Sequence, residues 1–311
     1  MSRNSKPSRF SRKAIAVDFQ KNRLLYLMAL PGIILVILFN YLPMGGLLMA
    51  FENYRPKQGI LGSEFVGLQN FADFFGSVFF GRVLKNTLAI SLLQLVIEFP
   101  LTIIFALLLN EITGRKFRRT ITTVSSFPYF ISMVVMAGII IDFCGSRGVI
   151  TQAVSAFTGS QQNVLGVPEY WRPLYITTDI WKDIGFGSII YVAALAGVDK
   201  ELYEAAEIDG AGKWKQMLHV TLPGIAPTIT IMLILRVGQL MSVGYEKTIL
   251  LYNSQIYETA DIISSFVYRK GLLEANYGFS TAVSLFNSVI NLILLLITNK
   301  ISSKVSETSL F

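Results

Sequence analysis

Charge-free stretches alternate with charged segments along this chain. The first stretch covers residues 24–51, and the last covers residues 275–299. A helix needs about 20 predominantly apolar residues to cross the hydrocarbon core of a bilayer. Both stretches are long enough, so the pattern predicts helices that span a membrane rather than the core of a soluble domain.

Four more spanning helices are expected between these two. They cover residues 83–110, 120–141, a short charge-free part at 184–198, and 223–245. Glu98 and Pro100 interrupt the second span, and the fourth must start early enough to include Trp181, Lys182 and Asp183. With 52% hydrophobic and 15% charged residues, the chain is too apolar for a soluble domain of this size. The predicted fold is an all-α integral membrane protein with six transmembrane helices in residues 24–303.

The basic residues indicate the orientation of these spans. Sixteen of the 27 Lys and Arg residues fall in the segments 1–23, 111–119, 199–222 and 300–311. Lys and Arg are enriched in cytoplasmic loops, so we expect both termini in the cytoplasm. Residues 1–23 then form a basic tail that acts as a topogenic signal, with contact to anionic membrane lipid as a further option. Residues 304–311 form a C-terminal cytoplasmic tail.

Residues 199–222 carry the longest polar helical pattern in the chain. Asp199 is suited to cap a short helix, and Gly210 and Gly212 break it because glycine adopts the left-handed backbone of a tight turn. A second short helix follows, and Pro223 is expected to end it. The pattern therefore predicts two short helices joined by a turn, held between two hydrophobic segments.

The residues of this segment resemble the EAA loop of permease subunits in ATP-binding-cassette (ABC) importers. The family pattern reads EAA, three residues, G, nine residues and I-x-L-P, and Val220 stands here in place of the isoleucine. The positions concerned are Glu204, Ala205, Ala206, Asp209, Gly210, Leu222 and Pro223. An amphipathic interfacial helix is the alternative, but the joint spacing argues against it. The resemblance implies the type I (MetI-like) permease core, in which this loop docks in a cleft of the ATPase and couples its closure to the membrane helices.

Three stretches also resemble the large-oligosaccharide permeases of Gram-positive bacteria. They lie at residues 127–132, 205–211 and 267–272. This resemblance implies oligosaccharide import by alternating access, with a second homologous permease, two ATPase subunits that bind ATP and Mg²⁺, and an extracytoplasmic sugar-binding lipoprotein. A type I permease for an amino acid or phosphate is the alternative, although such permeases lack the first and third of these stretches.

The sequence contains no residue set for catalysis or metal binding. It has no Gly-x-x-x-x-Gly-Lys-Ser/Thr phosphate loop, and its single His219 and single Cys144 cannot form a catalytic triad or a metal cluster. We therefore expect a conduit and not an enzyme, with no cofactor of its own and no nucleic-acid partner. A membrane-embedded enzyme would need a paired catalytic set that the chain lacks.

Ionisable residues within the spans are candidates for a substrate path, because charges are costly in lipid and usually face a partner or a cavity. Arg236 lies in the fifth span, with Gln239 close by. Its guanidinium is suited to hydrogen-bond sugar hydroxyls or carboxylates, and it is equally suited to pair with Glu98. The two roles are compatible.

Five more polar residues complete the candidate path. Asp142, Trp181 and Asp183 lie toward the outer end, where they could meet substrate released from a binding protein. Interfacial anchoring is the stronger expectation for Trp181. Asn287 and Asn291 share a face of the sixth span, where hydrogen bonding between helices is the simpler explanation.

Overall fold

The computed structural model describes residues 18–159, 163–305 and 309–310. Most of the predicted N-terminal tail and half of the predicted C-terminal tail lie outside the described residues. Most of the described chain is helical. The single strand pairing joins β1 (Glu52–Asn53) and β2 (Glu64–Phe65) in an antiparallel ladder.

The elements follow one another along the chain as helices with short interruptions. The first half contains α2 (Arg23–Val36), η1 (Ile37–Tyr41), η2 (Leu42–Phe51), α3 (Gly59–Gly62), α4 (Gln69–Gly76), α5 (Phe80–Leu93), η3 (Gln94–Glu98), α6 (Phe99–Glu111), α7 (Arg115–Ser126), η4 (Phe127–Phe130), α8 (Met133–Cys144) and α9 (Val149–Thr158). The second half contains η5 (Val164–Gly166), α10 (Pro168–Leu195), α11 (Lys200–Ile208), α12 (Lys213–Gln216), η6 (Met217–Thr221), α13 (Leu222–Val237), α14 (Tyr245–Leu251), α15 (Tyr257–Ala260), α16 (Ile263–Tyr268), η7 (Arg269–Leu273) and α17 (Tyr277–Val305).

Five helical stretches of the described chain are long and apolar enough to cross a membrane. They are Arg23–Phe51, Phe80–Glu111, Met133–Thr158, Lys213–Val237 and Tyr277–Lys304. A sixth stretch is long and apolar enough only when α10 and α11, which meet at a bend of 74°, are taken together. The predicted first, second and sixth spans agree with these helices to within a few residues. The fourth begins before its charge-free part, as expected, and the fifth ends at Val237, well short of residue 245.

The third predicted span, residues 120–141, is wrong as one continuous helix. The 3-10 turn η4, which carries Pro128, separates α7 from α8. Ile131 has an extended backbone, and the Ser132 hydroxyl caps α8 by accepting a hydrogen bond from the Val135 N–H at 3.3 Å. Proline cannot donate to a helical ladder and crowds the turn before it. The apolar stretch is therefore divided between two helices.

Three prolines each follow a π turn by two residues. The turns η1, η3 and η6 precede Pro43, Pro100 and Pro223, and in each the N–H just after the turn bonds to the carbonyl five residues earlier. The wider turn relieves the clash between a proline ring and the carbonyl four residues before it. The prediction that Pro223 ends a helix is therefore wrong, because the helix continues from Lys213 to Val237.

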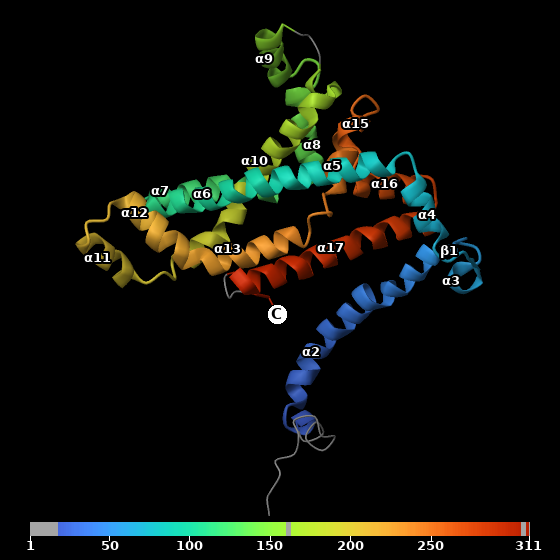
Figure 1. Ribbon diagram of the computed structural model, residues 1–311, viewed down its shortest axis with the longest axis horizontal. Coiled ribbons are helices and arrows are strands. Elements are labelled where there is room, and N and C mark those ends of the chain that lie inside the picture. Colours follow the sequence, from blue (N-terminus) through green and yellow to red (C-terminus); the bar gives the residue numbers. More distant parts are fainter. Residues whose placement is uncertain (1–17, 160–162, 306–308, 311) are drawn as a thin grey trace, which may run out of the picture.

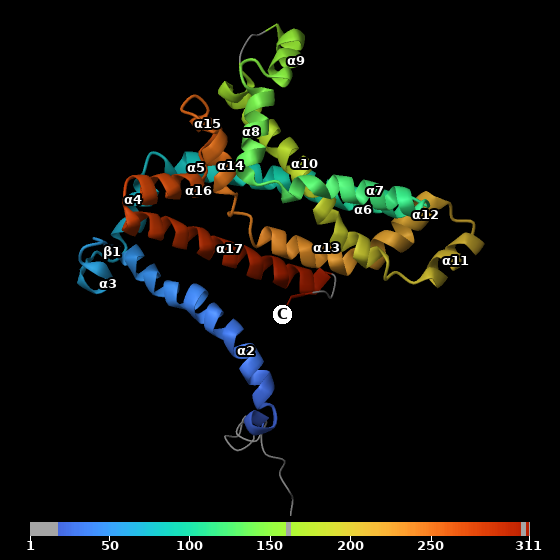
Figure 2. The ribbon, with the colours of Figure 1, turned by 180° about the vertical axis from the view of Figure 1, so that it is seen from behind.

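Helix α10 holds the centre of the bundle. It packs against α6, α7 and α13, and it buries Trp171, Tyr175 and Tyr191. Gly185 allows close approach to α7, since a β-carbon there would lie 2.1 Å from the Ser125 carbonyl oxygen. Figures 1 and 2 show α5, α6, α7, α13 and α17 grouped in the bundle, whereas α2 leaves it. No residue of α2 is buried.

Candidate functional site: a polar cavity and a two-helix segment

A polar cavity of about 480 Å³ lies between η4, α10, α13 and the junction of η3 with α6. Its polar and aromatic lining includes Glu98, Tyr129, Asp183, Tyr191, Arg236 and Gln239. A narrow extension of about 40 Å³ shares Arg236 and Gln239 with it and reaches Gln94. Four of the eight residues predicted for a substrate path are therefore brought together in one cavity.

The predicted pair of Arg236 and Glu98 is confirmed. The Arg236 guanidinium donates to Glu98 Oε2 at 2.9 Å, which joins α13 to the second span. The carboxylate is nearly buried, whereas the arginine side chain is 38% exposed. The remaining guanidinium donors therefore have room to reach a ligand while one is held by Glu98.

Asp183 and Gln239, unlike Arg236, are not held by another side chain. No hydrogen bond or ion pair to either side chain occurs within the part of the chain that the structure describes. Both line the cavity, Asp183 from α10 and Gln239 from the turn after α13. Their polar atoms are therefore open to a ligand or to water.

The other predicted path residues do not line this cavity. Asp142 and Trp181 are exposed on α8 and α10. Asn291 accepts a hydrogen bond from the Met241 N–H at 2.9 Å and donates to Ser242 Oγ at 2.8 Å, so it bonds to the connection between α13 and α14 and not, as expected, to another helix. The Asn287 Oδ1 atom is buried without a partner among the described residues.

A second ion pair, between Lys247 and Asp179, is buried and was not predicted from the sequence. Lys247 of α14 donates to Asp179 Oδ1 and to the Tyr175 carbonyl, each at 2.6 Å. Gln94 of η3 donates to the other Asp179 oxygen at 2.7 Å. Asp179 lies four residues before Asp183, so the shared helical face was a usable signal. No comparable signal existed for Lys247, because residues 246–274 were expected to form an external stretch.

Aromatic residues also contribute to the cavity wall in a way the sequence did not indicate. Tyr129 stacks on Phe186 with ring centroids 3.9 Å apart and planes 10° apart. Lys182 donates to the Tyr129 and Ile131 carbonyls at 2.8 and 3.1 Å. These carbonyls lie at the break between η4 and α8, where the helical ladder is interrupted. Lys182 therefore stabilises the break that places Tyr129 at the cavity.

The segment 199–222 has the predicted pair of short helices. The Asp199 carboxylate accepts the Glu201 N–H at 3.0 Å, which confirms the cap of α11. Gly210 has φ +76°, and the Gly210 and Ala211 N–H groups bond back to the carbonyls of Glu207 and Ala206. This is the hydrogen-bond pattern of a Schellman motif, which ends a helix at a left-handed residue. Gly210 therefore makes the turn, as predicted.

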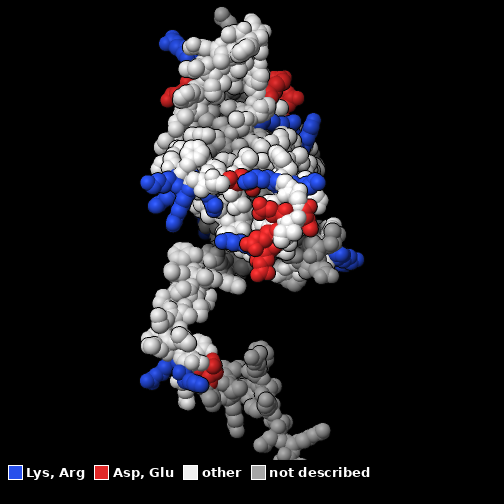
Figure 3. Space-filling model, turned by 90° about the vertical axis from the view of Figure 1, so that its left-hand side faces the viewer, with Lys and Arg blue, Asp and Glu red and all other residues white. Residues whose placement is uncertain are grey.

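Polar and apolar side chains are both presented at this end of the molecule. Glu201, Glu204, Glu207 and Asp209 are exposed on or just after α11. Figure 3, seen from this end, shows acidic side chains gathered near the centre with basic ones beside them. Leu202, Ile208, Trp214 and Leu218 are each more than half exposed. The Tyr203 hydroxyl donates to Thr221 Oγ1 at 3.0 Å and so fixes α11 against η6.

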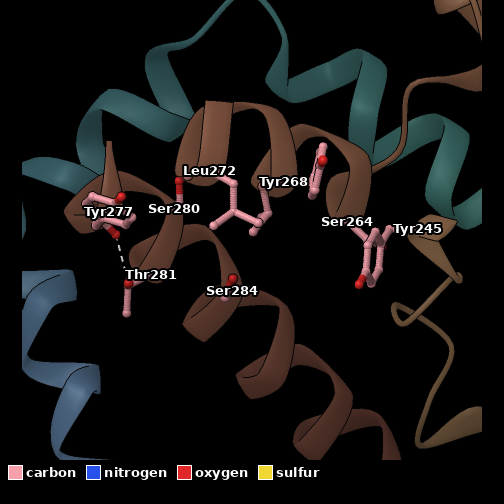
Figure 4. A pocket seen from close by; sticks show the side chains of 10 residues that line it. Tyr245, Ser264, Tyr268, Leu272, Tyr277, Ser280, Thr281 and Ser284 are labelled. Atoms are coloured by element: carbon pink, nitrogen blue, oxygen red, sulfur yellow. Dashed lines mark hydrogen bonds between the residues drawn. The ribbon is translucent and has the colours of Figure 1, made fainter. Parts of the chain in front are cut away.

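Another pocket, of about 390 Å³, lies between α16, η7 and α17 (Figure 4). Tyr245, Tyr268 and Tyr277 line it together with serine, threonine and apolar side chains, and Tyr245 and Tyr268 stack at 6.0 Å. It has no carboxylate, ammonium or guanidinium group and none of the predicted path residues. The cavity with Arg236 is therefore the stronger candidate for a polar ligand.

Comparison with known proteins defines the class. Residues 98–307 match the family described as binding-protein-dependent transport system inner membrane component, and the chain belongs to this family. The matched region includes the cavity and the segment 199–222. The fold prediction of a type I ABC importer permease is thereby confirmed.

Individual relatives narrow the comparison. The chain is 40% identical to the polygalacturonan/rhamnogalacturonan transport system permease protein YteP of Bacillus subtilis (strain 168), over 96% of this chain and 94% of that protein. It is 41% identical to Protein LplB of the same organism, over 94% and 92% of the two chains. It also superposes with a TM-score of 0.86 and 40% identity on a chain of a bacterial ABC transporter involved in the import of the acidic polysaccharide alginate, covering 94% of this chain and 99% of that one. That transporter is also known in complex with an alginate pentasaccharide-bound periplasmic protein.

Proposed function

We propose that this chain is the permease subunit of an ATP-driven importer that moves oligosaccharides across the cytoplasmic membrane by alternating access. The observation that carries the proposal is the polar cavity between helices of a chain that belongs to a transport family. The relatives named for polygalacturonan, rhamnogalacturonan and alginate support a sugar over an amino acid or phosphate.

The chemistry of the cavity suits a carbohydrate. Arg236 supplies planar guanidinium donors, and Gln239 and Asp183 supply an amide and acceptor oxygens for hydroxyl groups. Tyr129 and Phe99 bring aromatic rings to the same wall. Concave sites that combine apolar rings with a few polar groups are typical of small-ligand binding. Arg236 and Gln239 would orient the sugar, and the rings would exclude water from its faces.

We further propose that segment 199–222 docks on an ATPase subunit. Exposed carboxylates and large apolar side chains on two short helices would complement a cleft with basic and apolar groups. The complete transporter would hold this permease, a second homologous permease, two ATPase subunits that bind ATP and Mg²⁺, and a sugar-binding lipoprotein outside. Both termini of this chain would lie in the cytoplasm.

The test is to purify the complex of this permease with the subunits encoded beside it and to reconstitute it in liposomes. An oligosaccharide presented with its binding protein should stimulate ATP hydrolysis and accumulate in the lumen. Amino acids and phosphate serve as matched negative solutes. Stimulation by one of these solutes, or none by any oligosaccharide, would contradict the proposal.

A further inference from the structure

The pocket between α16, η7 and α17, which we call the tyrosine pocket, carries tyrosine hydroxyls without a partner. Tyr245, Tyr268 and Tyr277 line it (Figure 4). No hydrogen bond to any of the three phenol groups occurs among the described residues. Interfacial anchoring explains single tyrosines near the ends of spans, but it does not require three of them to meet at one pocket. The pocket is therefore suited to a ligand that carries hydroxyl groups.

Serine and threonine residues add hydroxyl oxygens to the same lining. Ser264, Ser280 and Thr281 each donate to a backbone carbonyl, at 2.5, 2.7 and 2.7 Å, and their lone pairs are left as acceptors. The Ser284 hydroxyl, one turn further along α17, has no hydrogen bond among the described residues. The lining contains no charged side chain. Donors and acceptors are thus offered together, as the hydroxyl groups of a sugar require.

Two of the tyrosines also present an aromatic surface. Tyr245 and Tyr268 stack with ring centroids 6.0 Å apart and planes 21° apart. The same two residues line a neighbouring pocket of about 360 Å³, so the ring pair borders two hollows. A sugar ring has an apolar C–H face that packs on an aromatic ring and a polar rim that bonds to hydroxyls. A lipid chain would use the rings but leave the hydroxyl groups unsatisfied, so the lining favours a carbohydrate.

The tyrosine pocket adjoins the polar cavity along the turn between α13 and α14. The narrow extension of the cavity reaches Val243. The Val243 carbonyl accepts the hydrogen bond from Ser264 of the tyrosine pocket, and Tyr245 follows two residues later. In the orientation proposed above, this turn lies at the outer end of the fifth span. A sugar that enters from outside would therefore meet the tyrosine pocket before the polar cavity.

We propose that the tyrosine pocket is a second sugar subsite, which binds a unit of an oligosaccharide on its way to the polar cavity. The proposal rests on the proposed function and deepens it by adding a binding site on the outer side of the path. The phenol groups and Ser284 bond to the sugar hydroxyls, and the stacked pair of Tyr245 and Tyr268 packs against one face of the sugar ring.

Protection of an introduced cysteine tests the subsite directly. After Cys144 is replaced, the transporter with Ser284→Cys is purified in nanodiscs and reacted with a water-soluble thiol reagent. Xylotriose, arabinotriose and a galacturonate trisaccharide are the probes, and each is also tested for stimulation of ATP hydrolysis. A trisaccharide at about ten times its Kd should slow the reaction about tenfold, because a filled pocket excludes the reagent. Phe157→Cys is the control, since Phe157 is 92% exposed on α9 and lies outside the pocket.

Substitutions in the stacked pair assign the protection to the tyrosines. Tyr268→Leu should raise the trisaccharide concentration that gives half protection about two- to tenfold, the range that one aromatic contact contributes. Tyr245→Leu should do the same from the other half of the pair. Tyr41→Leu is the matched control, since Tyr41 is 64% exposed on η1 and does not line the pocket.

The outcomes separate the subsite from the proposed function. The inference alone is overturned if a trisaccharide stimulates ATP hydrolysis without protecting Ser284→Cys, or if both tyrosine variants bind it as tightly as Tyr41→Leu. A cysteine that is unreactive without sugar also overturns it, because the pocket would then be covered by lipid or by another subunit. If no trisaccharide stimulates ATP hydrolysis, the proposed sugar transport fails and the inference fails with it.

Discussion

Replacing Lys247 with methionine would test whether the buried ion pair holds the bundle together. Lys247 is 2% exposed, and it joins α14 to α10 through Asp179 and the Tyr175 carbonyl. Methionine keeps most of the side-chain length and apolar stem but removes the ammonium. The Asp179 carboxylate would then remain buried with Gln94 as its side-chain partner.

The expected loss is large, because an unpaired buried charge costs more than the pair contributes. Breaking a buried ion pair by removing one partner typically costs about 3–5 kcal/mol. A second change, Asp179→Asn, removes the stranded charge and leaves an amide that can still bond to Gln94. The double variant should therefore recover most of the loss, to within about 1–2 kcal/mol of the native protein.

The assay is equilibrium unfolding of the purified permease in mixed detergent micelles, with transport measured in parallel. Lys213→Met is the matched control, since Lys213 pairs with Glu111 at 3.1 Å while its side chain is 74% exposed. Exposed pairs contribute about 0–1 kcal/mol. The reasoning is refuted if Lys247→Met costs no more than this control, or if the double variant is no more stable than Lys247→Met.

Three further predictions concern the cavity, the coupling segment and the orientation. Arg236→Leu should leave assembly intact and lower sugar uptake at least about tenfold, because the cavity loses the guanidinium donors that would orient the sugar; normal uptake at normal expression would contradict this. Glu204→Lys should weaken co-purification of the ATPase by reversing a docking charge, and Gly210→Val should do so by straining a left-handed turn by about 1–2 kcal/mol; full retention of the ATPase in both variants would disprove the docking role. After the native cysteine is replaced, an impermeant thiol reagent should label Phe157→Cys but not Ser303→Cys in intact cells, and the reverse result would invert the six-span orientation.

The sequence predicted those features that depend on residues near one another in the chain. Spans follow from local runs of apolar residues, and the Asp199 cap and the Gly210 turn follow from the chemistry of single residues. The pair of Arg236 with Glu98 could be predicted from the sequence for another reason. A charge in a span requires a partner, and few candidates exist in so apolar a chain.

The features that the sequence did not predict depend on contacts between distant segments. The break before α8 leaves carbonyls that Lys182 satisfies from another helix, 53 and 51 residues away in sequence. Lys247 joins Asp179 across 68 residues. The π turn before Pro223 keeps a helix intact where the rule for prolines predicts an end. Hydropathy carries no information on such pairings.

Polar contacts also explain why the cavity lies where it does. Apolar helix faces have little preference for one neighbour over another in lipid, since the lipid tails are equally apolar. The π turn η3 supplies two polar contacts from one turn, Gln94 to α10 and Glu98 to α13. Lys247 then ties α14 to the same point on α10. These contacts fix the neighbours of α10 around the cavity, and Asp183 and Gln239 line it without a side-chain partner among the described residues.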